Sequence, residues 1–175
     1  ADSALVYYLK ALALRESAGD KKSIALTCNN IGVVYYRWGD HEQALSYYLR
    51  AQRLMEALGD SVNSALYINN IGVTCRDWGR MDEALASFTS ALALSRAIGH
   101  VFATGYSLNN IGTVHEKRGN YPVALDYYRQ SLNWFQSKNH RRGTMMSMNS
   151  LGNLFNLTGN PAEARTYAAK AYAIA

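Results

Sequence analysis

Glycine or asparagine recurs at 20-residue intervals along this 175-residue chain, and this period constrains the fold more than any other feature. The positions are Gly19, Gly39, Gly59, Gly79, Gly99, Gly119, Asn139 and Gly159. These two residue types most readily adopt the left-handed backbone conformation that ends a helix. The next residue is a good N-cap at Asp20, Asp40, Asp60, Asn120 and Asn160, and a weaker one at Arg80 and His100. Each mark therefore predicts one helix end and, directly after it, one helix start.

The residues between the marks are apolar at three- and four-residue spacing. Ala44, Leu45, Tyr48, Ala51 and Met55 illustrate the pattern. This is the period of an amphipathic helix, whereas a half-buried strand alternates every two residues. We therefore predict an all-α fold with nine helices of about 17 residues, joined by turns of about two residues.

Alternate helices resemble each other, so the structural repeat is 40 residues long. Asn-Asn-Ile-Gly occurs at 29–32, 69–72 and 109–112, and it becomes Asn-Ser-Leu-Gly at 149–152. A period of about 20 to 50 residues with two helices per unit indicates an α-solenoid, in which each helix pair buries its apolar face against the next pair.

The repeat resembles the tetratricopeptide repeat. The first complete unit matches that family's pattern with Cys28, Ile31-Gly32, Tyr35, Ala44, Tyr48 and Ala51. The resemblance implies a right-handed α-solenoid of antiparallel helix pairs, in one array over residues 1–175. We expect the second helix of an incomplete repeat at 1–18, and repeats at 21–58, 61–98, 101–138 and 141–175. Longer-period members that the chain resembles include spindle-orientation adaptors, kinesin light chains and bacterial regulators.

Four further glycines lie inside predicted helices, at Gly32, Gly72, Gly112 and Gly152. Glycine in a helix interior costs about 1 kcal/mol relative to alanine, so something is expected to approach these positions too closely for a methyl group. The second helix of each pair is the expected neighbour. Its small surface would come from Ala44, Ala84, Ala124 and Ala164.

Composition argues against several function classes. The net charge is only +5 and charged residues make up 18% of the chain, below the roughly 25% of a typical soluble domain, so we expect no nucleic-acid partner. No apolar stretch approaches the roughly 18 residues that span a bilayer, so we expect no membrane partner. Two cysteines, Cys28 and Cys75, are too few for a disulfide scaffold, which favours a reducing, cytoplasmic setting.

No motif for catalysis is found. The four histidines lack metal-ligand spacing, and no phosphate-binding glycine loop or nucleophile motif occurs. His115 occupies the aromatic packing position of its repeat, so we expect it in the core or an interface. We predict no metal, no cofactor and no enzymatic activity.

The paired asparagines are the strongest candidates for function, because asparagine is a mediocre helix former and needs a reason to recur inside helices. The resemblance implies that the first helix of each unit lines a concave groove. It also implies that asparagine just before the Leu-Gly position grips the backbone of an extended peptide, since an amide both donates and accepts. This role falls to Asn29, Asn69, Asn109 and Asn149. The alternative is that one member of each pair locks neighbouring repeats together, which suits Asn30, Asn70 and Asn110 best.

The same helix face is expected to complete the groove one turn further on. Its predicted lining is Val33, Val73, Thr113, Asn153, Tyr36, Arg37, Arg76 and Lys117. These residues are mixed in character, and the lysine and arginine set of carboxylate-clamp members is missing. Arg37, Arg76 and Lys117 remain candidates to pair with isolated acidic side chains of a ligand, although exposed charges are more often only solvated.

Three functions remain open from the sequence. The leading prediction is a protein-protein interaction scaffold that holds a peptide or extended protein segment in its groove. The second is a peptide- or effector-sensing segment of a larger bacterial signalling protein. The third is a self-assembling array, because the chain begins and stops in second helices without polar caps, so we expect either a fragment of a longer protein or end-to-end contacts between copies.

Overall fold

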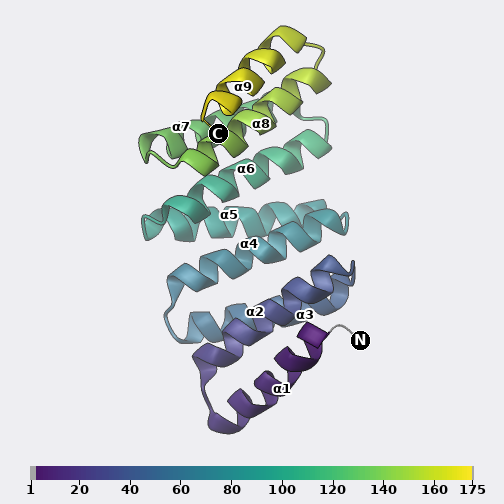
Figure 1. Cartoon of the computed structure of the whole chain (residues 1–175), viewed down its shortest axis with the longest axis vertical. Helices are drawn as coiled ribbons and strands as arrows, with labels where there is room; N and C mark the ends of the chain where they lie inside the picture. The colour runs from purple at the N-terminus through teal and green to yellow at the C-terminus, as the bar shows by residue number, and fades with distance from the viewer. Residues whose placement is uncertain (1–2, 175) are drawn as a thin grey trace. The chain divides into compact units, whose positions relative to one another are not determined.

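The computed structural model describes residues 3–174, which form nine α-helices and no strand (Figure 1). They are α1 (Ser3–Ala18), α2 (Lys21–Arg37), α3 (His41–Ala57), α4 (Ser61–Asp77), α5 (Met81–Ala97), α6 (Val101–Lys117), α7 (Tyr121–Ser137), α8 (Arg141–Leu157) and α9 (Pro161–Ile174). The all-α prediction is confirmed. The connection between α1 and α2 has the predicted two residues. From the end of α2 onwards each connection has three residues, because a C-cap residue such as Trp38 precedes the left-handed residue.

The chain divides into two compact units, residues 1–94 and 95–175. In the first unit α2 packs on α3 and α4 packs on α3, and α1 covers α2. In the second unit α6 pairs with α7 and α8 pairs with α9, while α7 also packs on α8. Both units are therefore runs of helix pairs of the TPR-like α-solenoid class. One continuous array over 1–175 stays a prediction.

Each unit has an apolar core between its helix layers. The first core contains Leu12, Ile24, Cys28, Ile31, Met55 and Tyr67. The second contains Tyr128, Leu132, Met148, Leu151 and Leu154. Both Cys28 and Cys75 are buried free thiols, and burial raises the pKa of each thiol, as expected for cysteines that serve as small core residues.

Every 20-residue mark ends a helix in the left-handed conformation. The seven glycines have φ between 66° and 85°, and Asn139 has a φ of 52°. The following amide closes the helix end, as in the 3.0 Å hydrogen bond from the Asp40 N–H to the Tyr35 carbonyl. The period that predicts the helix ends is thus explained by backbone geometry.

The side-chain N-caps predicted from the sequence form at some of the helix starts and not at others. Asp20, Asp40 and Asp60 each accept a hydrogen bond from the backbone N–H three residues later. Asn120 does not, in a first turn from which Pro122 has removed one N–H donor, so its expected side-chain cap is wrong. The side chain of Asn160 donates to Thr158 instead.

Three of the four mid-helix glycines, Gly32, Gly72 and Gly112, make room for an aromatic ring, and only Gly112 and Gly152 also contact the backbone of the alanine that the sequence suggests. A Cβ added to Gly32 would lie 2.8 Å from the Tyr48 ring, and one added to Gly72 would lie 2.6 Å from the Phe88 ring. Both rings belong to the second helix of the pair and are buried. The glycine therefore lets the ring lie directly on the first helix, and Ala44 and Ala84 are buried without being the closest neighbours of Gly32 and Gly72.

Gly105 and Gly143 follow the same principle outside the 20-residue pattern. An added Cβ would meet the Phe135 ring at 2.2 Å from Gly105 and at 2.3 Å from Gly143. Phe135 of α7 thus contacts both first helices of the second unit at positions that carry no side chain, and it is completely buried.

The fourth repeat lacks the aromatic residue, and this allows a matched test. Ala168 stands where Tyr128 stands one repeat earlier, and a Cβ on Gly152 would meet nothing closer than 3.5 Å. We predict that Gly152→Ala raises the free energy of unfolding by about 1 kcal/mol, the helix propensity gain. Gly112→Ala should lower it by about 1–3 kcal/mol, because the new methyl group displaces the Tyr128 ring.

Urea denaturation of the two variants measures both effects. Equal changes in stability at Gly112 and Gly152 would contradict the claim that the ring requires glycine.

Candidate functional site

The first unit contains a depression of about 240 Å³ where α2, α3 and α4 meet. It is lined by Val33, Tyr36, Arg37, Tyr48, Asn70, Val73 and Thr74. Five of these seven residues are predicted groove or ladder residues, so the expected face of α2 and α4 does form one surface. Val33 and Val73 give it an apolar part, and the Tyr48 ring, held against Gly32, closes it from the side of α3.

A second depression of about 220 Å³ adjoins the first and shares Val33 and Arg37 with it. Its other lining residues are Ala4, Tyr8, Asn30, Val34 and Trp38. We call these two adjoining depressions together the α2–α4 groove.

In the first unit, an asparagine of the predicted ladder, Asn29, contacts an asparagine of the predicted stacking set, Asn70. The Asn70 side-chain amide of α4 donates a 3.0 Å hydrogen bond to Oδ1 of Asn29 on α2. This is the locking bond between repeats that the sequence offers as the alternative for Asn70. This bond uses Nδ2 of Asn70 and Oδ1 of Asn29. Nδ2 of Asn29, a donor, and Oδ1 of Asn70, an acceptor, have no hydrogen-bond partner among the described residues.

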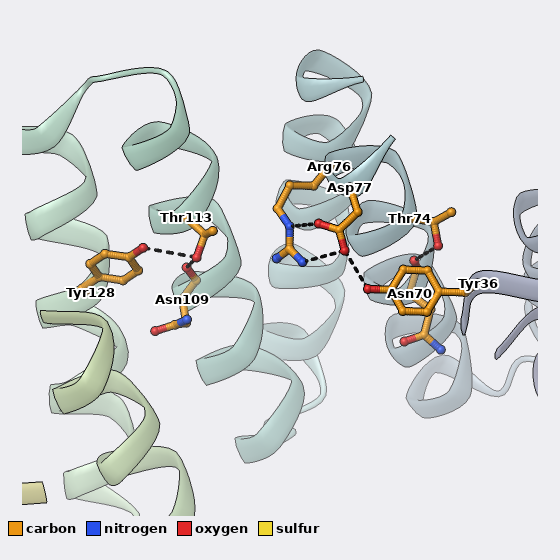
Figure 2. A network of polar contacts seen from close by, with 8 residues as sticks. All are labelled: Tyr36, Asn70, Thr74, Arg76, Asp77, Asn109, Thr113 and Tyr128. Carbon is orange, nitrogen blue, oxygen red and sulfur yellow. Dashed lines mark hydrogen bonds and ion pairs between the residues drawn. The ribbon is translucent and has the colours of Figure 1, made fainter. Parts of the chain in front are cut away.

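Of the two arginines of the first unit that are predicted to pair with a ligand carboxylate, Arg76 is already paired within the chain. Arg76 forms an ion pair with Asp77 at 2.8 Å, and the Asp77 carboxylate also accepts a 2.6 Å hydrogen bond from the Tyr36 hydroxyl (Figure 2). Burial, and then this hydrogen bond, raises the pKa of Tyr36. Arg37 forms no ion pair with any described residue. The positive charge of the groove is therefore that of Arg37, while Asp77 neutralises Arg76.

One ladder residue of the second unit, Asn109, is buried, whereas Asn29 of the first unit is half-buried. Asn109 is only 7% exposed, and its backbone carbonyl accepts a hydrogen bond from Thr113 (Figure 2). The Tyr128 hydroxyl donates to Glu116 at 2.9 Å, with Thr113 beside it at 3.2 Å. Asn109 thus does not present its amide on an open surface, in contrast to its predicted ladder role. Lys117, Asn149 and Asn153 are exposed, and Asn110 is half-buried.

Buried Asn109 lacks the partner that Asn29 has. By the 40-residue repeat, Asn109 corresponds to Asn29, and Ser150 corresponds to Asn70. The serine side chain is too short to make the bond, and Oδ1 of Asn109 is buried without a hydrogen-bond partner. The decay of Asn-Asn to Asn-Ser in the sequence therefore marks a missing bond between α6 and α8.

The described residues contain no cluster of metal-ligating side chains, and no helix among them combines the length and apolarity that crossing a bilayer requires. His115 stacks on Tyr127 with ring centroids 5.7 Å apart, and burial, with a smaller contribution from Arg118, lowers its pKa. It is a packing residue, as predicted.

Three aromatic residues of the groove are not among the sequence candidates. Tyr48 is interpreted from the sequence as packing alone, yet it also lines the groove. Tyr8 and Trp38 line the second depression, and Trp38 is 49% exposed. The recurrence of tryptophan at 38 and 78, directly before the marks, is the signal that could have pointed to Trp38.

Helix pairs at a 40-residue period, with an aromatic ring on a mid-helix glycine and an open face on the first helices, define a helical-repeat scaffold. The family model for the tetratricopeptide repeat matches residues 1–57, 25–97 and 103–175. The chain belongs to the tetratricopeptide repeat family. No curated protein sequence matches it.

Solved structures share the fold at low identity. BtubC from P. vanneervenii is 19% identical with a TM-score of 0.84, over 97% of this chain and 71% of that protein. The Rap conjugation gene regulator of plasmid pLS20, solved with the Phr* peptide, is 22% identical with a TM-score of 0.73, over 92% of this chain and 47% of that one. The kinesin light chain repeats of Podosopora anserina are 13% identical with a TM-score of 0.74, over 97% and 84%. The chain thus spans about half the length of the Rap regulator.

The missing bond of Asn109 can be restored. We predict that Ser150→Asn raises the free energy of unfolding by about 1 kcal/mol, because it gives the buried Oδ1 a donor. Chemical denaturation measures the gain. In an Asn109→Ala background the same substitution should give no gain, and an equal gain there would show that the effect does not pass through Asn109.

Proposed function

We propose that the chain is a non-catalytic interaction module that binds an extended peptide segment along the α2–α4 groove. The observation that carries the proposal is the Asn29–Asn70 hydrogen bond. Asn70 lines the groove, and half-buried Asn29 is its hydrogen-bond partner on α2. The bond between the two amides fixes their orientation, so neither side chain has to be ordered when a ligand arrives.

The pair suits a peptide backbone. Asn29 keeps a donor and Asn70 keeps an acceptor, and each peptide residue offers one carbonyl and one N–H. An extended segment exposes these groups to a neighbour, whereas a helix uses them internally. One residue of an extended segment can therefore bond to both amides, and the same role for Asn69 and Asn149 stays a prediction.

The groove side chains favour particular ligand side chains. Val33 and Val73 suit a small apolar side chain beside the Tyr48 ring. Arg37 has no ion pair of its own, so it attracts a carboxylate of the ligand. Arg76 is a weaker candidate than the sequence suggests, because it would have to leave Asp77. We therefore expect peptides that combine an acidic and a small apolar residue.

The likeness to the Rap regulator supports the alternative of a sensor. That regulator was solved with a bound peptide, and this chain matches about half of its length. In this second candidate function the same groove binds the peptide, but the bound peptide changes the activity of a neighbouring domain. The adaptor and the sensor differ in that neighbour, and not in the groove.

Selection from a random peptide display library tests the proposal. We expect enriched peptides to contain an acidic residue, and the Arg37→Ala variant to bind them about three- to tenfold more weakly in fluorescence anisotropy. Asn29→Ala should weaken the same peptides by about tenfold, because it removes the donor.

Arg53 provides the matched control, since it is an exposed arginine of α3 outside the groove. Arg53→Ala should leave the affinity within about twofold. Failure to enrich any peptide, or equal losses in the Arg37 and Arg53 variants, would refute the proposal.

A further inference from the structure

The first unit contains a further cavity, of about 140 Å³, which shares no residue with the α2–α4 groove. We call it the Ser64 cavity. Apolar cavities of about 150 Å³ bind a ring of benzene's size, so this volume suits one aromatic side chain that is partly inserted. The residues that matter for its chemistry are Gln52 and Glu56 of α3, Ser61, Ser64 and Ile68 of α4, and Leu94 in the last turn of α5.

Ser64 brings a polar group to this cavity that the chain does not satisfy. The residue is only 4% exposed, and its Oγ has no hydrogen-bond partner. One repeat later, the equivalent Thr104 donates to the Ser95 hydroxyl at 3.1 Å. Met55 stands at the position of Ser95 in the first unit, and a thioether sulfur is only a weak acceptor. The hydroxyl of Ser64 is therefore left for a polar group that enters the cavity.

The second unit has a tryptophan ring at the equivalent place. The ring is half-buried, and it lies on a surface with one apolar and one charged neighbour that both have counterparts in the Ser64 cavity. Trp134, Leu108 and Arg96 line this surface, and forty residues earlier they correspond to Leu94, Ile68 and Glu56.

Two contacts hold the Trp134 ring. Its Nε1–H donates to the Val101 carbonyl at 2.9 Å, and Nζ of Lys138 lies 5.2 Å from the ring centre, which is a cation–π distance. Ser61, which lines the cavity of the first unit, is the residue equivalent to Val101. Leu94 has neither a ring nor an N–H, so it cannot fill the same space or donate to the Ser61 carbonyl.

The charge beside the cavity is opposite to the one beside Trp134. Glu56 stands where the second unit has Arg96, and both side chains are exposed. The Glu56 carboxylate accepts a 2.9 Å hydrogen bond from Gln52 and forms no ion pair with any described residue. A ring that carries a cation beside it is therefore favoured over one that carries an anion.

We propose that the Ser64 cavity binds a tryptophan side chain from a basic segment of a partner protein. The indole takes the place that Trp134 fills in the second unit, with its ring against Ile68 and Leu94. Its N–H faces the oxygens of Ser61 and Ser64, and a lysine or arginine beside it pairs with Glu56. This site takes a different ligand from the α2–α4 groove, and it does not rest on the peptide proposed for that groove.

NMR titration of the whole chain with two tripeptides tests the proposal. We expect acetyl-Lys-Trp-Lys-amide to shift the amide signals of Ser61 and Ile68 in a saturable way, with a dissociation constant of about 1 mM. Acetyl-Glu-Trp-Glu-amide should bind about fivefold more weakly, although the net charge of +5 favours it elsewhere on the chain. In Glu56→Gln the two affinities should agree within about twofold.

The indole N–H and the cavity are tested separately. The lysine tripeptide with 1-methyltryptophan, which has no N–H, should bind about fivefold more weakly. Leu94→Trp, which introduces the residue of the second unit, should abolish the shifts of Ser61 and Ile68, and Leu94→Met should keep them. Arg37→Ala should leave these shifts unchanged, so a failure of the groove proposal is distinguishable from a failure of this one.

Three results would each overturn the proposal. They are the absence of saturable shifts at Ser61 and Ile68, equal binding of the methylated tripeptide, and binding of the glutamate tripeptide as tight as that of the lysine tripeptide. All three are measured on the unaltered chain, so they decide the question even where Leu94→Trp does not fold.

Discussion

The contact of a second-helix aromatic ring with a mid-helix glycine sets the geometry on which the rest depends. Tyr48 lies where Gly32 leaves space, and Phe88 and Tyr128 repeat the contact on Gly72 and Gly112. The ring fixes how close the two helices of a pair come and how the first helix is rotated about its axis. That rotation decides which side chains of the first helix are buried and which form the groove. In the fourth repeat, where the ring is missing, this constraint is relaxed.

Much of the fold could be predicted because it depends on local backbone chemistry. A left-handed residue at each helix end and a 3.6-residue apolar period are visible in the sequence, and the helices follow from them. The partner of Gly32 could not be predicted, because both Ala44 and Tyr48 lie on the facing helix. His100 and His140 cap α6 and α8 through Nδ1. Residue type alone does not predict these caps, because they depend on which ring nitrogen faces the helix.

Several residues that line the α2–α4 groove could be predicted from the sequence, but the bonds between them could not. Asn29 and Asn70 are expected to serve either a ligand or the stacking, and in the structure one bond between them leaves polar groups for both roles. The charges differ more, because neither periodicity nor composition reveals that Asp77 pairs with Arg76 and accepts from Tyr36. Of Arg37 and Arg76, which the sequence offers as partners for isolated acidic side chains of a ligand, only Arg37 has no ion pair, so the proposed ligand would place its carboxylate near α2.

The central claim is that the orientation fixed by the ring and the Asn29–Asn70 bond presents a donor and an acceptor to a peptide backbone. Side-chain amide NMR spectra with saturating library-selected peptide test it most directly. The account predicts a large shift and slowed solvent exchange for the Asn29 Nδ2 protons, and no change for exposed Asn133 on α7. Bound peptide with an unchanged Asn29 amide signal would contradict it.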